Sequence, residues 1–495
     1  MRPAVVARRL CRLRTIAAGR LDSRARVGTI PRDVNPRHDI VIVGAGFSGT
    51  LTCAHLLRRA RQLSDRTMHV TLVEQEPRRV ARGFAYSTPH DACLLNVPAG
   101  RMSAFEDRID DFVEWARTRD PAITGGAFVP RGVYGQYLAS LLREAQSGLP
   151  ARVSFDQVVG ESAVSIDPAS VTLSSGRVLR ADRIVLALGN FPPCDPSFID
   201  ARVIQSERYT RNPWAPDALT KITRDGDVLL IGTGLTMFDV ALVLRDAGHR
   251  GAIHAVSRRG LVPQPHRVAA TPPLQLPFPQ SMRIQRPSPG RLLRALRREV
   301  REASRRGDDW REVVTALRHD TPMLWQSLDE RGRRQFLRHL QPFWDTHRHR
   351  AAPQTAARVQ RLRDEGQLLV RAARLLSVEP DEPGCALRVR LRPRGATYVE
   401  TLEVSHVINC TGPDPDLKRG GGPLIVHLFE RGLATADRHG LGLRTAPDGA
   451  LLDGDGSPSD RLFTLGPPRR GDLWETTAVP ELRIQSSALI RQLIG

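Results

Sequence analysis

The chain has 495 residues, enough for about three domains of ordinary size. Its formal net charge is +20, but 71 of its 73 basic residues are arginine, and they form no compact basic stripe with interleaved aromatic residues of the kind that binds nucleic acid. No apolar run approaches the ~18 residues of a membrane span. We therefore expect no nucleic-acid or membrane partner, a cytoplasmic location, and a positive field that attracts a small anion.

The first segment, residues 1–37, contains ten arginines and only two acidic residues. Arg8-Arg9 invites comparison with an export signal, but no 7–15-residue apolar stretch follows it. We expect a disordered extension, or a start codon placed too early, and exclude the segment from the fold.

The second segment predicts a strand, a glycine turn and a helix. Residues 40–43, Ile-Val-Ile-Val, are typical of a buried parallel strand. Gly44-x-Gly46-x-x-Gly49 follows, and a second apolar strand ends at Glu74, whose carboxylate is suited to ribose hydroxyls. The helix N-terminus offers N–H groups to phosphates. This combination predicts a dinucleotide site, although a glycine turn that binds nothing is the alternative. The predicted contacts are Gly44, Gly46, Phe47, Ser48, Gly49, Glu74 and Gln75.

Two further strands end at a glycine. Residues 178–190 form an apolar run that stops at Gly189, after a polar-alternating stretch that predicts a β-meander with a turn at Ser175-Gly176. Residues 404–413 repeat the pattern and stop at Gly412. A glycine here lets the chain pass close to a bound cofactor, so we include Gly189 and Gly412 among the cofactor contacts.

A second glycine turn follows the apolar strand at residues 228–231. Gly232 and Gly234 match the pattern, with Thr236 beside them, but the third position is Met237. A bulky residue there predicts looser dinucleotide binding. The next strand ends at Arg258-Arg259, which suits a 2′-phosphate, although arginine is common throughout this chain. We interpret the first turn as an FAD site and the second as a site for NAD(P)H, with the choice between NADH and NADPH open.

These elements predict an α/β fold of two interleaved three-layer (β/β/α) Rossmann-like domains. Residues 38–205 form the first part of the FAD-binding domain, 206–403 the NAD(P)-binding domain, and 404–495 the second FAD-binding part. Apolar residues at helical spacing on a charged background predict a helical insert at about 286–365, which we interpret as a lid or a dimer surface.

The cysteines and histidines restrict the chemistry. Six scattered cysteines contain no C-x-x-C pair, which argues against a disulfide framework, a zinc site or a redox dithiol. His339, His347 and His349 lie among arginines and indicate a solvated helix face, so we predict no metal. Without a dithiol or iron–sulfur spacing, O₂ is the remaining common acceptor for electrons from a reduced flavin.

Several strings resemble a known family: "GFAYST" (83–88), "LLNVPAGRMSAFEDRIDDFVEWA" (94–116), "FVPRGVYGQYL" (128–138), "GTGLTMFD" (232–239) and "LGPPRRGDLWETTAVPELRIQ" (465–485). They are similar to the bacterial FAD/NAD(P)-binding family that includes FAD-dependent urate hydroxylase and aspartate N-monooxygenase. A more distant similarity links them to ornithine and lysine N-hydroxylases. The resemblance covers almost everything after residue 38 and implies an FAD-dependent monooxygenase that uses NAD(P)H and O₂.

The resemblance also implies residues near the flavin. Asn96 and Arg101 would lie beside the isoalloxazine, as a hydrogen-bond partner and an anion contact; a surface loop is the alternative. The C-terminal string would bring Gly466 and a helix N-terminus to the flavin pyrimidine. Trp474, Glu475 and Thr476 are candidates there, with ordinary packing of Trp474 as the competing interpretation.

The resemblance includes a urate hydroxylase, so we expect the substrate to be urate, hydroxylated to 5-hydroxyisourate. Its anion is also electron-rich, and arginines match its oxygens. The alternatives are N-hydroxylation of an amine or amino acid such as aspartate, and a reductase that passes electrons to another acceptor. The oligomeric state stays open.

Overall fold

The computed structural model describes residues 37–63, 66–268, 277–381 and 386–494. The predicted N-terminal extension, apart from Arg37, lies outside the described residues. Among the helices of the described part, none is long and apolar enough to cross a membrane.

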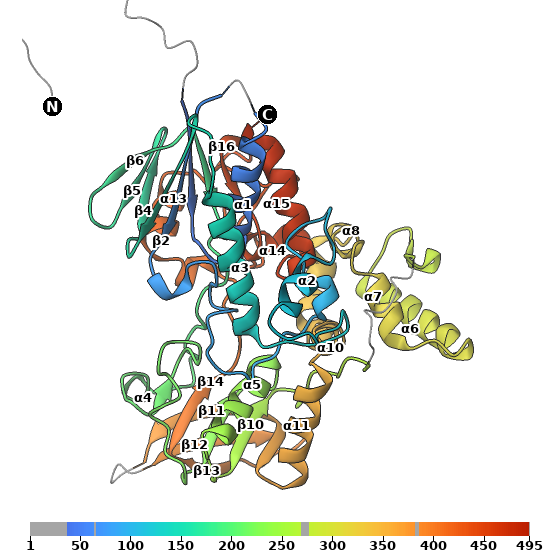
Figure 1. The fold of residues 1–495 in the computed structure, drawn as a ribbon. Helices are drawn as coiled ribbons and strands as arrows, with labels where there is room; N and C mark the ends of the chain where they lie inside the picture. Colours follow the sequence, from blue (N-terminus) through green and yellow to red (C-terminus); the bar gives the residue numbers. More distant parts are fainter. Residues whose placement is uncertain (1–36, 64–65, 269–276, 382–385, 495) are drawn as a thin grey trace, which may run out of the picture. The chain divides into compact units, whose positions relative to one another are not determined.

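The first of two large sheets has six strands in the order β15-β16-β7-β1-β2-β3 (Figure 1). All neighbours are parallel except β15 and β16. The strands are β1 (His38–Val43), β2 (Met68–Glu74), β3 (Val153–Val159), β7 (Arg183–Leu186), β15 (Ala450–Leu452) and β16 (Pro458–Thr464). Strands from both ends of the described chain therefore share one sheet, which is the interleaving that the sequence predicts.

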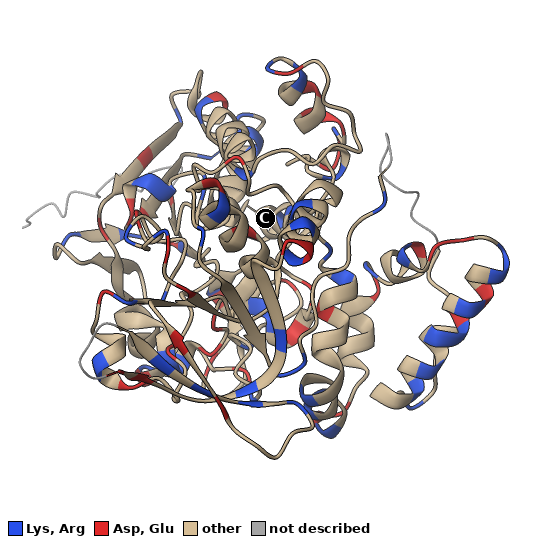
Figure 2. Ribbon diagram, turned by 90° about the horizontal axis from the view of Figure 1, so that it is seen from below, with Lys and Arg blue, Asp and Glu red and all other residues tan. Residues whose placement is uncertain are grey.

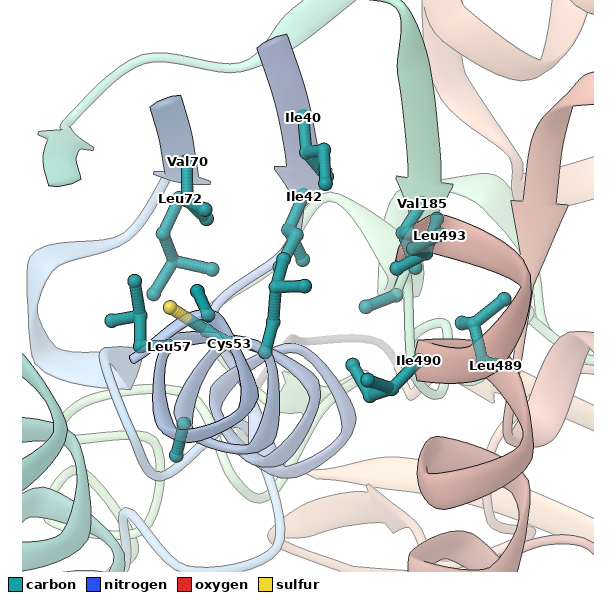
Figure 3. Close-up of a cluster of buried hydrophobic side chains, with 14 of the residues drawn as sticks. Ile40, Ile42, Cys53, Leu57, Val70, Leu72, Val185, Leu489, Ile490 and Leu493 are labelled. Atoms are coloured by element: carbon teal, nitrogen blue, oxygen red, sulfur yellow. The ribbon is translucent and has the colours of Figure 1, made fainter. Parts of the chain in front are cut away.

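The strand β1 is apolar along its whole length because both of its faces are covered. Ile40 and Ile42 point to one side, where they pack against α1 (Phe47–Ala60) and α15 (Val479–Ile494). Figure 3 shows Cys53 and Leu57 of α1 and Ile490 of α15 facing these strands. The helix α3 (Arg131–Gln146) packs on α1.

Val41 and Val43 point to the other side of the sheet, against a small antiparallel sheet. That sheet has the order β4-β5-β6, with β4 (Ala163–Asp167), β5 (Ser170–Leu173) and β6 (Val178–Arg180). It is the predicted meander, and α13 (Gly422–Glu430) packs beside β4. Small sheet, large sheet and helices form the three predicted layers.

The second large sheet has the order β13-β12-β11-β10-β9-β14-β8. Its strands are β8 (Tyr209–Thr210), β9 (Val228–Ile231), β10 (Ile253–Ser257), β11 (Leu368–Pro380), β12 (Leu387–Pro393), β13 (Glu400–Val404) and β14 (His406–Asn409). Alternate residues of β9 again face opposite sides: Val228 and Leu230 pack with helices α5 (Leu235–Asp246) and α11 (Pro353–Asp364), and Leu229 and Ile231 pack with the antiparallel strands β11–β13.

The predicted insert is helical. It contains α6 (Pro289–Arg305), α7 (Trp310–Ala316), α8 (Thr321–Gln326), α9 (Glu330–Gln335), the π-helix η4 (Phe336–Leu340) and α10 (Gln341–Arg348). Tryptophans and leucines from these helices form their own apolar clusters, one of which includes Trp474.

The remaining short elements connect these layers. They are η1 (Pro77–Arg79), η2 (Ala99–Arg101), α2 (Asp111–Arg117), α4 (Ala201–Ile204), η3 (Gln280–Met282), α12 (Leu417–Gly420), η5 (Pro467–Arg469) and α14 (Arg470–Leu473).

Three predicted boundaries differ from the structure. Residues 404–413 were expected to open the last FAD-domain part, but β14 lies in the second sheet between β9 and β8. The predicted insert reaches residue 365, yet α11 covers the second sheet as the crossover between the parallel strands β10 and β11. The apolar run 178–190 is divided: β6 belongs to the small sheet and β7 to the large one. Apolar content alone does not tell to which sheet a strand adds.

Candidate cofactor and substrate site

A cavity of about 270 Å³ lies at the carboxyl ends of β1 and β2. Ligands of open parallel sheets bind at this edge. Of the predicted cofactor contacts, Gly44, Gly46, Phe47, Ser48, Glu74, Gln75 and Gly189 line this cavity. The first glycine turn and the first strand–glycine element therefore meet around one space.

The glycines of the first turn are required by close backbone contacts. A Cβ on Gly44 would lie 2.4 Å from the carbonyl oxygen of Ala187, and the φ of Gly44 is +100°. A Cβ on Gly49 would lie 1.8 Å from the carbonyl oxygen of Gly44. Gly49 does not line the cavity; its role is to let α1 approach β1. Gly46 packs against Gly83, with 3.3 Å from a Cβ on Gly46 to the Cα of Gly83.

The cavity fits a dinucleotide. Gly46 begins α1 without any side-chain cap, so the first N–H groups of the helix are left for phosphate oxygens. At the end of β2 the buried carboxylate of Glu74 accepts hydrogen bonds from the N–H groups of Ala45 (2.9 Å) and Glu76 (3.1 Å). Both hydrogen bonds hold the carboxylate at the cavity wall, where the ribose is expected.

Other cavity residues were not predicted. Gly421 and Gly422 lie at the start of α13, and Gly83, Tyr86 and Thr477 come from loops. A Cβ on Gly189 or Gly422 would meet nothing within 4 Å, so both glycines border open space. Gly412 has a φ of +84° but does not line the cavity. Gly83 and Tyr86 both lie in the string 83–88, which resembles the known family. This resemblance was the sequence signal from which the two residues could have been predicted as cavity residues.

The second glycine turn packs differently from the first. A Cβ on Gly232 would lie 2.6 Å from the carbonyl oxygen of Cys410, so this turn packs on β14. Gly234 begins α5 without a side-chain cap, and a Cβ there would meet nothing within 4 Å. Met237 is fully buried in the core between α5 and the sheet. At the position where the first turn has Gly49 in close backbone contact, the second turn thus has a buried methionine side chain. The roles of Gly232, Gly234 and Thr236 stay predictions.

Arg258 and Arg259 follow β10 as predicted. The guanidinium of Arg259 lies 5.1 Å from the ring centre of Phe343 and donates to the carbonyl of His339, 3.4 Å away. This arginine therefore contacts the helical insert. Its pairing with a 2′-phosphate stays a prediction, as does that of Arg258.

Asn96 and Arg101 lie together in a second, smaller cavity of about 50 Å³. Four arginines line it: Arg101 from η2, Arg318 after α7, and Arg348 and Arg350 around the end of α10. The Nε2–H of His266 donates to the backbone carbonyl of Asn96 at 3.0 Å, because a carbonyl oxygen can only accept. We call this space the arginine cavity.

The arginine cavity shares a loop with the cofactor cavity. Thr477 lines the cofactor cavity, and the next residue, Ala478, lines the arginine cavity. The loop leads into the N-terminus of α15 at Val479. An anion in the arginine cavity would therefore lie next to whatever fills the Thr477 end of the cofactor cavity.

Positive charge is concentrated in the arginine cavity. Burial, with repulsion from Arg348 and Arg311, lowers the pKa of Arg350 to about 9. Burial, with repulsion from Arg318 and Arg348, lowers the pKa of Arg101. Burial and the charge of Arg350 lower the pKa of His266 to about 3, so this imidazole is neutral at pH 7. A bound anion would relieve this repulsion.

Two carboxylates, one buried and one partly buried, offset part of the charge. Glu481 of α15 forms a bidentate pair with Arg318, and Glu475 lies 3.4 Å from Arg348. The Nε atoms of Arg348 and Arg350 are buried and have no hydrogen-bond partner within the described part of the chain. The arginines that line the arginine cavity thus include buried N–H donors without a hydrogen-bond acceptor among the described residues.

The C-terminal candidates are placed differently. The indole of Trp474 stacks on Trp325, 5.0 Å between ring centres, and belongs to the apolar cluster of the insert; its φ of +60° is unusual for a side chain of this size. Thr476 is fully buried and donates to the carbonyl of Gly466 at 3.0 Å. Neither residue lines the cofactor cavity, whereas Thr477 and Pro467 do. Contact of Trp474, Thr476 and Gly466 with a flavin stays a prediction.

The helix-face interpretation of the histidine–arginine string was incomplete. His339 and His347 are exposed, but Arg348 and Arg350 are buried. Histidine and arginine alternate over residues 347–350, at the end of a helix. This alternation could have indicated that the two arginines point to the same side.

Comparison with known proteins agrees with this geometry. Residues 41–191 match a family model described as FAD-NAD(P)-binding. These residues contain the first glycine turn and much of the cofactor cavity. The chain therefore contains an FAD/NAD(P)-binding domain, and the prediction of FAD and NAD(P)H as its cofactors is confirmed. No curated protein sequence matches the chain.

Several solved structures have a similar fold. The ornithine hydroxylase of Pseudomonas aeruginosa is 14% identical with a TM-score of 0.59, over 92% of this chain and 99% of that one. The L-lysine 6-monooxygenase of Pseudomonas syringae is 16% identical with a TM-score of 0.61, over 92% and 98%. The cadaverine monooxygenase of Erwinia amylovora is 11% identical with a TM-score of 0.59, over 93% and 95%. The predicted two-domain flavoprotein fold is thereby confirmed.

Proposed function

We propose that this protein is an FAD-dependent monooxygenase that uses NAD(P)H and O₂ to hydroxylate the amine nitrogen of a small carboxylate-bearing substrate, such as aspartate. The observation that carries the proposal is the arginine cavity, which shares the Thr477–Ala478 loop with the cofactor cavity. An anionic substrate held there would lie beside the cofactor.

The reaction is balanced by the two cofactors and O₂: an amine R–NH₂, NAD(P)H, H⁺ and O₂ give R–NHOH, NAD(P)⁺ and H₂O. FAD, when bound, would take the hydride from NAD(P)H and pass the electrons to O₂. The chain's own contribution is to hold the dinucleotide at Gly44, Gly46 and the N-terminus of α1, and to hold the substrate.

The arginines would bind the substrate carboxylate. Guanidinium groups donate to a carboxylate in a bidentate arrangement, and the buried Nε atoms of Arg348 and Arg350 have no hydrogen-bond partner among the described residues. The neutral His266 adds no further charge and holds the backbone of Asn96 at the cavity wall. Because the cavity is small and its arginines are largely buried, bulk water would be kept from the bound substrate.

The amine reading is favoured over urate, the substrate that we expected. The three solved structures above are named for ornithine, lysine and cadaverine, each of which carries an amine. Urate is the second candidate, because as an anion it matches the same arginines. A reductase that uses another electron acceptor shares the cofactor cavity but gives no role to the arginine cavity.

The test is steady-state turnover with paired substrates. Aspartate, asparagine, a simple alkylamine and urate are each added with NADPH or NADH in air, and the product is analysed by mass for one added oxygen atom. We expect a hydroxylamine from aspartate, with a lower KM for aspartate than for the alkylamine. Product from urate alone would replace the amine proposal, and electron transfer to a quinone without any oxygenated product would overturn both.

A matched pair of variants tests the arginine cavity. Arg350→Met removes a buried cation that like charges already disfavour, so we expect normal FAD content and a KM for aspartate raised about 10-fold or more, since a charge-assisted hydrogen bond contributes roughly 1.5–3 kcal/mol. Arg361→Met, an exposed arginine on α11, is the control and should change neither. An unchanged KM in Arg350→Met would contradict substrate binding at this cavity.

A further inference from the structure

A third cavity lies inside the helical insert and has no assigned role. Its volume is about 660 Å³, within the range of sites that hold drug-sized ligands. It lies between α6, α7, α8, η4 and α10, with Trp474 on one side. None of its lining residues lines the cofactor cavity or the arginine cavity. We call it the insert cavity.

The lining of the insert cavity is apolar and aromatic. Four of the six tryptophans of the chain, Trp310, Trp325, Trp344 and Trp474, line it together with leucine and valine side chains from α6 and α7. A space of this size with such walls is far larger than the voids that protein cores leave by imperfect packing. The walls would gain by contact with an apolar ligand.

The helix α6 forms a wall that the described residues cover only in part. Leu292, Leu296 and Val300 repeat at helical spacing, line the cavity and are only half-buried. The opposite wall is closed, because Val314, Leu317 and Trp325 are buried. One wall of the cavity therefore consists of buried core side chains, and the other wall is the half-buried apolar face of α6.

Positive charge marks the edge of the cavity. Arg297 and Arg301 lie one helical turn apart on α6, and both line the insert cavity while remaining exposed. Figure 2 shows the basic residues along this helix. Long arginine side chains cover apolar surface with their stems and keep the guanidinium at the water boundary, so they would meet the charged end of a ligand whose apolar body lies inside.

We propose that the insert cavity binds an amphipathic carboxylate: an apolar chain or ring system seated among the four tryptophans, with its anionic group on Arg297 and Arg301. The site is separate from the cofactor and arginine cavities, so the proposal does not depend on the function proposed above. A second copy of this chain, seated on the half-covered face of α6, is the rival occupant.

The tryptophans provide a direct readout in the full-length protein. Linear carboxylates from butyrate to laurate are titrated while tryptophan emission is followed, with the alcohols of equal chain length as uncharged probes. We expect saturable quenching, tighter with each added methylene, because each buried CH₂ contributes about 0.8 kcal/mol. Each carboxylate should bind more tightly than the matching alcohol. Absence of saturable quenching at every chain length would overturn the proposal, as would equal affinity of acids and alcohols.

Charge variants on α6 separate specific from unspecific binding. Arg297→Gln combined with Arg301→Gln should weaken laurate binding about 10-fold and leave the alcohol unchanged. Arg298→Gln, an exposed arginine on the same helix that does not line the cavity, is the matched control and should bind laurate normally. Equal weakening by Arg298→Gln would contradict the placement of the carboxylate.

The oligomeric state decides between ligand and second copy. In sedimentation experiments, the protein should have the same oligomeric state with and without laurate. A dimer that dissociates on laurate addition, and that Leu296→Glu also abolishes, would assign the face of α6 to a protein interface and overturn the ligand proposal.

Discussion

Replacing Gly49 by alanine tests the close packing of α1 on β1 that shapes the cofactor cavity. The added Cβ would lie 1.8 Å from the carbonyl oxygen of Gly44 and 3.2 Å from the Cβ of Ala187. Ordinary contact requires 3.4–4 Å from the Gly44 oxygen, so the start of α1 must move by more than about 1 Å. This movement withdraws the N–H groups of the helix from the phosphates.

The cost follows from overpacking, about 1–3 kcal/mol. If it falls on the FAD-bound conformation, FAD binding weakens about 5- to 150-fold. The assay is the flavin absorbance of purified protein, followed by titration of the apoprotein with FAD. Gly234→Ala, the same change in the second turn, is the control: its φ is −84° and its Cβ would meet nothing within 4 Å, so FAD content should stay normal. Full FAD occupancy in Gly49→Ala would refute the reasoning.

Three further changes give separate results. Gly46→Asp places a carboxylate in the cofactor cavity beside the uncapped end of α1, so we expect protein without flavin; normal flavin content would contradict the phosphate cradle. Burial raises the pKa of Glu475, but Arg348, His349 and the hydrogen bond from Trp344 outweigh burial and lower it from 4.5 to about 2. The stability that this ionised carboxylate contributes is therefore fully present above pH 4.5 and is lost as the pH falls toward 2. Glu475→Gln should accordingly lower the free energy of unfolding by roughly 3 kcal/mol at neutral pH, as breaking a buried ion pair does, with the difference shrinking below pH 4.5 in denaturant titrations; a pH-independent difference would argue against the ion pairs. Arg258→Ser and Arg259→Ser should each raise the KM for NADPH and leave that for NADH unchanged, and equal effects on both coenzymes would remove the 2′-phosphate role.

The fold could be predicted from the sequence wherever a local pattern of residues determines an element. The run Ile40–Val43 is apolar at every position because both faces of β1 are covered, and the glycines at 44 and 49 are required by contacts of 2.4 and 1.8 Å. Each constraint leaves a signal that can be read within about ten residues of sequence, although the partner of Gly44, the carbonyl of Ala187, lies far along the chain. The meander and the helical insert were predicted for the same reason.

What escaped prediction depends on contacts between distant segments. Residues 406–409 form a buried strand that pairs with β8 and β9, which lie about 200 residues earlier in the chain. The arginine cavity collects side chains from residues 96–101, 266, 315–318, 348–350 and 478. In a chain with 71 arginines, composition gave no means of telling Arg348 and Arg350, which are buried, from the many that are exposed. Trp474 and Thr476 were selected from the string 465–485, in which Pro467 and Thr477 are among the residues that line the cofactor cavity.

The most direct test of the central claim is the stoichiometry of turnover with aspartate. NADPH oxidation, O₂ uptake and product are measured in the same reaction, with product identified by mass. The account predicts one hydroxylamine for each NADPH oxidised and each O₂ consumed, and no turnover without O₂. NADPH oxidation that yields only hydrogen peroxide with every amine tested would contradict it.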